Sequence, residues 1–270
     1  MNSLFSRMVL IAITALATPG LAWSQMRSPN MGRIDLGACK TDPHGMIHVA
    51  LGRSVFVRPF VPSWATVELS YKNNNPAPPD PEDGLGCPNH PAPMDSMGIP
   101  FDYAAINPEA AKAVPHLGVQ RLQVIAHNPA LTAATGDNLE LVSAEAVCAS
   151  DSIRETLPSG LLQCRTKPKV PGFRPEDWTT AYVAPLDIYA TPLGVKFTTW
   201  CGPETFTYSI FDCRVSYLLD VDVRIDYEFN PHYHGPTTQL PIGLLIDFDR
   251  ELRKKISSMR VPDYNWNRVP

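Results

Sequence analysis

The triplet His232-Tyr233-His234 is the arrangement in this chain that comes closest to a metal site. Two histidines separated by one residue of extended chain can point to the same side, and imidazole is a common ligand of Zn and Cu. No third ligand is identifiable, because the other histidines lie far away in the sequence: His44, His48, His90, His116 and His127. A polar loop rich in His, Asn and Pro needs no metal, so we expect neither a metal nor a cofactor.

Three carboxylates, Asp222, Asp226 and Glu228, share one face of a predicted strand with Arg224. General acid–base catalysis needs carboxylates inside a cleft, whereas alternation with apolar residues predicts an outer face in contact with water. This acidic face with one central Arg is the strongest one-sided charge feature in the chain. Acidic surfaces steer association with basic clefts, so we predict a partner-binding surface here, with His232 and His234 beside it.

Motifs that would name a reaction are absent from the sequence. The segment Gly52-Arg53-Ser54-Val55-Phe56 lacks the second glycine of a nucleophile elbow, and neither H-E-x-x-H nor a phosphate-binding glycine loop occurs. An enzyme is not indicated, although it is not excluded, and we name no catalytic residue. The formal net charge is -4 with no run of Lys and Arg, so we expect no nucleic-acid partner.

The N-terminal residues 1–24 have the features of a secretory signal peptide. Arg7 precedes an apolar run from Met8 to Ala17, and Ala22-Trp23-Ser24 supplies small residues for cleavage. The apolar run is shorter than the ~20 residues needed to span a bilayer. We therefore expect a periplasmic or secreted protein with no membrane span in the mature chain.

Six cysteines in a chain sent to an oxidising compartment predict disulfides. Cys148 with Cys164, and Cys201 with Cys213, are sequence neighbours that flank plausible hairpins, which leaves Cys39 with Cys87. No two cysteines have the close spacing of a zinc site.

The C-terminal part has the clearest periodicity. Residues 195–201, 213–219 and 221–229 alternate as strands, and Val221, Val223, Ile225, Tyr227 and Phe229 form the predicted buried face of the last strand. From Pro241 to Met259 the apolar period is helical, through Ile242, Leu245, Phe248, Leu252, Ile256 and Met259. We expect this helix to cover the apolar face of the sheet.

The N-terminal part is harder to interpret. We predict strands over Ile47–Phe60, Thr66–Tyr71 and Gln120–Ala126, a short helix over Pro108–Val114, and two bridged strands over Leu139–Cys148 and Gly160–Arg165. A Pro-rich extended loop runs from Pro76 to Pro100.

These elements predict an α+β fold, mainly antiparallel sheets with a C-terminal amphipathic helix, stabilised by disulfides. The polar segment Thr166–Asp177 is the predicted boundary between two domains. The predicted organisation is a signal peptide (1–24), a β-rich domain with the Pro-rich loop (25–165), and a meander plus helix (178–270).

The C-terminal pattern resembles a group of secreted proteobacterial proteins. It comprises Tyr189-Ala190-Thr191-Pro192-Leu193-Gly194, Cys201, Cys213, the strand to Phe229, Leu240-Pro241, Ile246-Asp247 and Arg250–Ile256. Some of these proteins resemble periplasmic immunity proteins, which neutralise toxins delivered by contact-dependent or type VI secretion. The resemblance implies no particular functional residues.

We therefore expect a periplasmic binding protein, an immunity or inhibitor protein that neutralises an envelope-active toxin. Two alternatives remain open: a secreted metal-dependent hydrolase or metal-binding protein using His232 and His234, and an envelope assembly factor. The expected partner is a protein, either a toxin or an envelope component.

Overall fold

The computed structural model describes residues 31–35, 45–59, 66–70, 86–114, 116–127, 139–149, 152–166, 179–202, 213–231 and 238–266. Several features predicted from the sequence lie outside these residues: the signal segment, Cys39, and the pair His232 and His234. Most of the predicted boundary segment (167–177) and the first part of the Pro-rich loop (76–85) also lie outside them.

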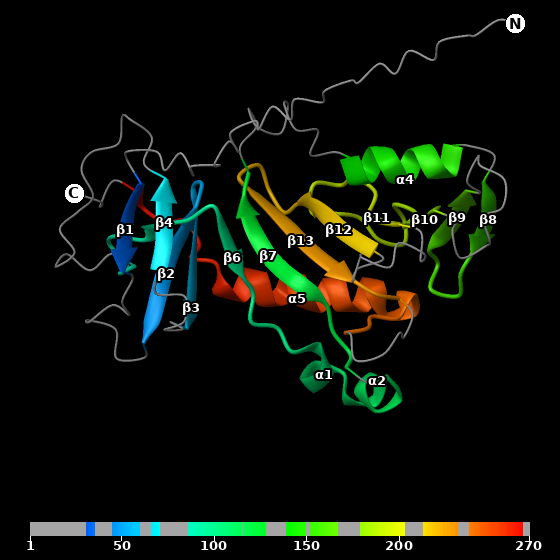
Figure 1. Ribbon diagram of the computed structural model, residues 1–270, viewed down its shortest axis with the longest axis horizontal. Helices are drawn as coiled ribbons and strands as arrows, with labels where there is room; N and C mark the ends of the chain where they lie inside the picture. Colours follow the sequence, from blue (N-terminus) through cyan, green and yellow to red (C-terminus); the bar gives the residue numbers. More distant parts are fainter. Residues whose placement is uncertain are drawn as a thin grey trace, which may run out of the picture.

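An antiparallel sheet of eight strands forms the centre of the molecule (Figure 1). Its order across the sheet is β6 (Ser96–Gly98), β7 (Gln120–Ala126), β13 (Val223–Phe229), β12 (Cys213–Leu218), β11 (Thr198–Cys201), β10 (Thr179–Val183), β9 (Leu162–Thr166) and β8 (Ile153–Thr156). The predicted α+β class, dominated by antiparallel sheet, is confirmed.

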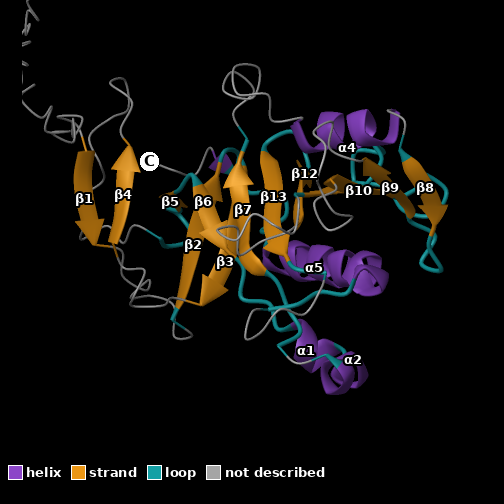
Figure 2. Cartoon of the chain, turned by 45° about the vertical axis from the view of Figure 1, so that its right-hand side comes forward, coloured by secondary structure: helices purple, strands orange, loops and turns teal. Residues whose placement is uncertain are grey.

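Two smaller sheets lie to one side of the large one (Figure 2). One joins β3 (Ser54–Pro59), β2 (Met46–Leu51) and β5 (Ala92–Pro93), and the other pairs β1 (Met31–Asp35) with β4 (Thr66–Ser70). Two short helices, α1 (Tyr103–Ile106) and α2 (Pro108–Ala113), precede β7. The side chain of Asn107 accepts a hydrogen bond from the Ala110 backbone N–H and caps α2, where a helix was predicted.

The large sheet continues across the predicted domain boundary. β9, which precedes residues 167–178, pairs directly with β10, which follows them, and β7 pairs with β13. One apolar core contains residues from Ile47 to Met259. The two predicted units therefore share a sheet and a core.

The predicted C-terminal helix is present as a 3-10 turn, η4 (Ile242–Leu244), followed by α5 (Leu245–Met259). The apolar positions of the predicted stripe that fall within α5 are all buried: Leu245, Phe248, Leu252, Ile256 and Met259. They belong to the same core as Val223, Ile225, Tyr227 and Phe229 of β13, which are each 0% exposed. α5 therefore covers the apolar face of the sheet, as predicted. The prediction of a buried face is wrong for Val221, which is 70% exposed because it lies in the turn before β13 begins at Val223.

The segment Leu139–Ala149 is a helix, α4, and the predicted strand is wrong. The segment is rich in Leu, Glu and Ala, which favour helix, and it lacks the strict alternation of a half-buried strand. Ala144 packs on Ala181 and Val183 of β10, in a cluster separate from the main core. Because Tyr182 belongs to the main core on the other side, α4 lies on the face of the sheet opposite α5.

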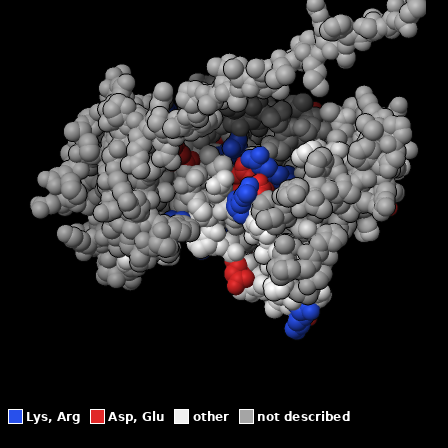
Figure 3. Space-filling model, viewed as in Figure 1, with Lys and Arg blue, Asp and Glu red and all other residues white. Residues whose placement is uncertain are grey.

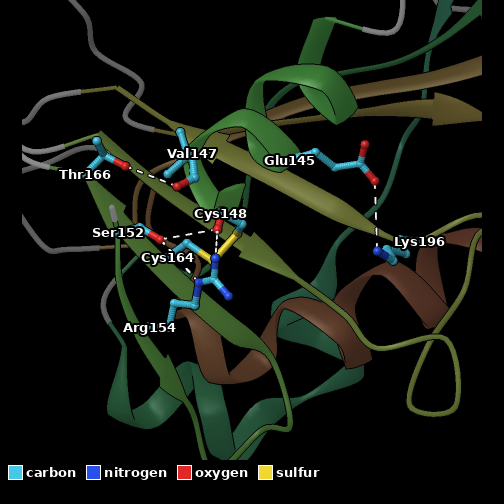
Figure 4. The surroundings of a disulfide bond; sticks show 8 residues. All are labelled: Glu145, Val147, Cys148, Ser152, Arg154, Cys164, Thr166 and Lys196. Atoms are coloured by element: carbon cyan, nitrogen blue, oxygen red, sulfur yellow. Dashed lines mark hydrogen bonds and ion pairs between the residues drawn. A yellow bond between two sulfur atoms is a disulfide. The ribbon is translucent and has the colours of Figure 1, made fainter. Parts of the chain in front are cut away.

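A disulfide and polar contacts hold the C-terminal end of α4 on the sheet (Figure 4). Cys148 bonds to Cys164 of β9, and the Cys148 carbonyl accepts hydrogen bonds from the side chains of Arg154 and Ser152. The Thr166 hydroxyl donates to the Val147 carbonyl at 3.2 Å. These side chains satisfy carbonyls that a helix C-terminus leaves without partners.

The second predicted bridge, Cys201 to Cys213, joins directly opposed residues of β11 and β12. Cys87 is also disulfide-bonded. Its predicted partner, Cys39, lies outside the described residues, so this pairing stays a prediction.

Within the part of the chain that the structure describes, no helix is both long and apolar enough to cross a membrane.

Candidate binding surface

Three of the predicted site residues lie together on the polar side of β13, between β12 and β7. We use the name polar face for the five charged side chains on this side of the sheet: Arg121, Arg214, Arg224, Asp226 and Glu228. Arg214 of β12 donates to both oxygens of Asp226, with 3.0 Å from Nε to Oδ1. Arg224 Nη2 lies 3.9 Å from Asp226 Oδ2, and Arg121 Nη1 lies 3.3 Å from Glu228 Oε1. Figure 3 shows basic and acidic side chains gathered over these strands.

The prediction of a solvated acidic face with one Arg is wrong for the described residues. Asp226 is only 3% exposed, and the neighbouring strands bring Arg214 and Arg121 to its side of the sheet. Strand order decides this, because β12 and β7 flank β13 and their side chains oppose those of β13. Each acidic side chain on the polar face is therefore paired with an arginine.

A β-bulge lies next to this pairing. The register between β13 and β7 shifts between Asp226 and Glu228, and Arg121 has a φ of 48°. A residue other than glycine rarely adopts this left-handed conformation, and bulges redirect side chains. The Arg121 side chain is 65% exposed while still reaching Glu228. Sequence periodicity gave no signal for this bulge.

The remaining predicted site residues are not gathered on the polar face. Asp222 lies in the turn before β13, where its backbone N–H donates to the Asp220 side chain at 2.8 Å. Its carbonyl accepts from the His127 backbone N–H at 2.6 Å. The predicted contribution of His232 and His234 falls outside the described residues.

A buried charge network lies on the opposite side of the sheet, beneath α5. Asp249 is 0% exposed and accepts hydrogen bonds from the hydroxyls of Tyr189 (2.8 Å), Tyr217 (2.8 Å) and Tyr227 (3.0 Å). Arg253 Nε lies 2.8 Å from Asp249 Oδ2. We call these five residues the tyrosine–aspartate network.

Burial dominates the titration of this network. Desolvation raises the pKa of Asp249, while Arg253 and the three tyrosine hydroxyls oppose that rise. Burial, followed by the nearby Asp249 charge, raises the pKa of Tyr189, Tyr217 and Tyr227. The sequence contains one signal of this burial: Asp249 occupies an apolar-stripe position, four residues after Leu245 and three before Leu252.

Tyr189 of this network belongs to the connection between β10 and β11, residues 184–197, which we call the aliphatic loop. Four of its large hydrophobic side chains are exposed: Leu186 (54%), Ile188 (48%), Leu193 (47%) and Val195 (47%). Sequence alternation had placed Val195 in a strand, but the following strand begins at Thr198.

Among the described residues, no group of three or more His, Cys, Asp or Glu side chains is arranged to hold a metal ion.

Comparisons with known proteins gave no match to a family model, a curated protein or a solved structure.

Proposed function

We propose that this protein is a periplasmic binding protein that neutralises an envelope-active toxin by binding it. The observation that carries the proposal is the polar face, where ion pairs hold three arginines and two carboxylates on adjacent strands of the large sheet. Side chains that are already ordered lose little entropy on binding, and arginine is enriched at protein interfaces.

The polar face defines the chemistry of the expected partner. Arg121 and Arg214 keep 65% and 43% of their side chains exposed, whereas Asp226 is nearly inaccessible. The groups offered to a partner are therefore mainly guanidinium donors, which bind carboxylates in a bidentate manner. The toxin surface bound here carries Asp or Glu side chains.

Two further features support a secreted inhibitor. The N-terminal sequence has the pattern of a signal peptide, and no described cysteine is free. Disulfides persist in oxidising compartments.

The test uses an envelope-active toxin, sought first among the genes that neighbour this one. A strain that produces the full precursor should survive that toxin when it is directed to the envelope, and the purified mature protein should form a complex with it. Arg121→Glu should weaken the complex by about tenfold or more, because it removes a donor and adds repulsion.

Lys112→Glu is the matched control. Lys112 is 71% exposed on α2, outside the polar face, so its reversal should change the affinity by less than about twofold. Absence of both protection and complex formation would contradict the proposed function. Equal weakening by the two reversals would remove the polar face as the binding surface.

A further inference from the structure

Exposed aliphatic side chains are concentrated in the aliphatic loop. In the described part of the chain, eight large hydrophobic side chains are exposed, and four of them lie within the ten residues 186–195. Single exposed hydrophobic residues need no explanation, but a concentration of them marks an interaction site.

The base of the loop is fixed in the core. The Ala184 backbone N–H donates to the Phe197 carbonyl at 2.8 Å, and both residues are 0% exposed. The Tyr189 ring packs edge-on against Phe197, with 5.3 Å between centroids, while its hydroxyl donates to Asp249. Arg253 donates to the Ala190 carbonyl at 2.8 Å and stacks over the Tyr189 ring. The tyrosine–aspartate network therefore holds the middle of the loop.

Two tight turns fix the exposed tips. In the first, the Pro185 carbonyl accepts hydrogen bonds from the backbone N–H groups of Ile188 and Tyr189, each at 3.0 Å. In the second, Thr191 and Val195 are joined by a 2.9 Å backbone hydrogen bond, and Gly194 has a φ of 74°, which glycine adopts readily. The aliphatic side chains are thus presented in a set geometry before any partner binds.

The charges around the loop identify the kind of partner. Asp187 is the one charged residue between positions 184 and 195, and it is exposed. Lys196, at the end of the loop, lies 3.9 Å from Glu145 of α4. The basic side chains of α5 beside the loop are paired within that helix, Arg250 with Asp247 and Arg253 with Asp249. An occupant therefore meets a largely apolar surface that carries the exposed carboxylate of Asp187.

We propose that the aliphatic loop docks into an apolar groove on a partner protein, with a basic side chain of that partner facing Asp187. A second copy of this chain is disfavoured, because a two-fold contact centred on the loop would bring Asp187 against Asp187. A lipid surface is disfavoured by the acidic tip, since membrane-binding elements carry basic and aromatic residues there.

This surface is separate from the polar face. The loop is anchored to the network beneath α5, whereas the polar face lies on the other side of the sheet. The inference goes beyond the proposed function: it rests on the periplasmic location proposed there but does not depend on the toxin. Its partner is a second protein of the envelope.

The experiment places a photoreactive benzophenone side chain at position 186 or 193 of the full chain, in cells that produce it. The control position is 106, because Ile106 is 49% exposed but lies on α1. We expect one envelope protein to be cross-linked from 186 and from 193, and not from 106. Adducts with a second copy or with lipid, no adduct, or the same adducts from 106 would overturn the proposal.

The cross-linked protein is then purified and titrated with the mature chain. Leu186→Ser combined with Leu193→Ser, and separately Asp187→Lys, should each weaken binding by about tenfold, while Ile106→Ser should change it less than about twofold. Unchanged binding by both loop variants would also overturn the proposal. Arg121→Glu should leave this titration unaffected, which separates its outcome from that of the proposed function.

Discussion

At the scale of single residues, Asp249 is a fully buried charged side chain with four polar partners. It has no exposed surface, and three hydroxyls and one guanidinium surround its two oxygens. Such a network orients α5 on the sheet and fixes the aliphatic loop through Tyr189. Its partners come from β12, β13, the loop and α5, so it forms only in the folded chain.

Asp249→Asn should lower the free energy of unfolding by about 3 kcal/mol, because it leaves Arg253 without a counter-charge and presents an NH2 group to tyrosine hydroxyls. Tyr227→Phe removes one hydrogen bond to a charged group and should lower the free energy of unfolding by about 1.5 kcal/mol. Urea denaturation measures both values. A loss for Asp249→Asn smaller than that for Tyr227→Phe would show that the network contributes little.

The three network tyrosines predict loss of stability in alkali. Their pKa values are raised in the folded protein, so they keep their protons above the usual value near 10, where the unfolded chain loses them. Their contribution to the free energy of unfolding is complete below that pH. It is lost as the pH rises above that value, by up to about 4 kcal/mol per pH unit for the three groups together.

Ultraviolet absorbance of tyrosinate, recorded beside circular dichroism, checks this expectation. Three of the nine tyrosines should ionise only as the protein unfolds. Tyr217→Phe should reduce the steepness of the alkaline stability loss. Ionisation of all nine while the fold is intact would be inconsistent with the buried network.

At the scale of elements, α4 and α5 are held in different ways. α5 buries an apolar stripe in the main core, whereas the small cluster around Ala144 and the bridge from Cys148 to Cys164 fix α4. Lys196 adds a contact of 3.9 Å to Glu145, and both side chains are about half exposed, so this pair contributes little (Figure 4).

Replacement of Cys148 and Cys164 by Ser should therefore free α4 selectively. The bridge closes a loop with a sequence separation of 16, for which the expected stabilisation is about 3 kcal/mol. Hydrogen exchange should rise in residues 144–149 and remain low in β13 and α5. Equal loss of protection in α5 would mean that α4 and the main core unfold together.

At the scale of the whole molecule, the C-terminal residues 260–266 connect the three-stranded sheet to the large sheet. Val261 donates its backbone N–H to the Val55 carbonyl at 2.8 Å, and the Arg260 side chain joins Ser54 of β3 to Asp220. Farther on, Tyr264 donates to the Pro88 carbonyl and Trp266 to the Arg53 carbonyl.

The shared sheet and core predict a single cooperative unfolding transition for the disulfide-bonded chain. Circular dichroism and tryptophan fluorescence should give coincident midpoints in urea. Deletion of residues 260–270 should lower that midpoint and raise hydrogen exchange first in β2 and β3. Two separated transitions in the intact chain would support the division near residues 166–177.

The sequence alone determined the features that depend on neighbours along the chain. The stripe of Leu245, Phe248, Leu252 and Ile256 predicted α5. Alternation from Val221 to Phe229 predicted the buried face of β13, which the structure confirms from Val223 onward but not for the exposed Val221. Both patterns repeat within a few residues, so they follow from helix and strand geometry. Pairing of Cys201 with Cys213 followed from short separation, as did Cys148 with Cys164, although the strand assumed for Cys148 is a helix.

Only the tertiary structure decided which charges meet. Arg214 pairs with Asp226, and Arg121 with Glu228, because β12 and β7 flank β13, and no local pattern encodes the order of strands. Asp249 is buried rather than solvated because tyrosines from distant elements supply its hydrogen bonds. The exposure of the aliphatic loop has the same origin: its apolar residues resemble core positions in sequence, and only the packed core shows that they lie outside it.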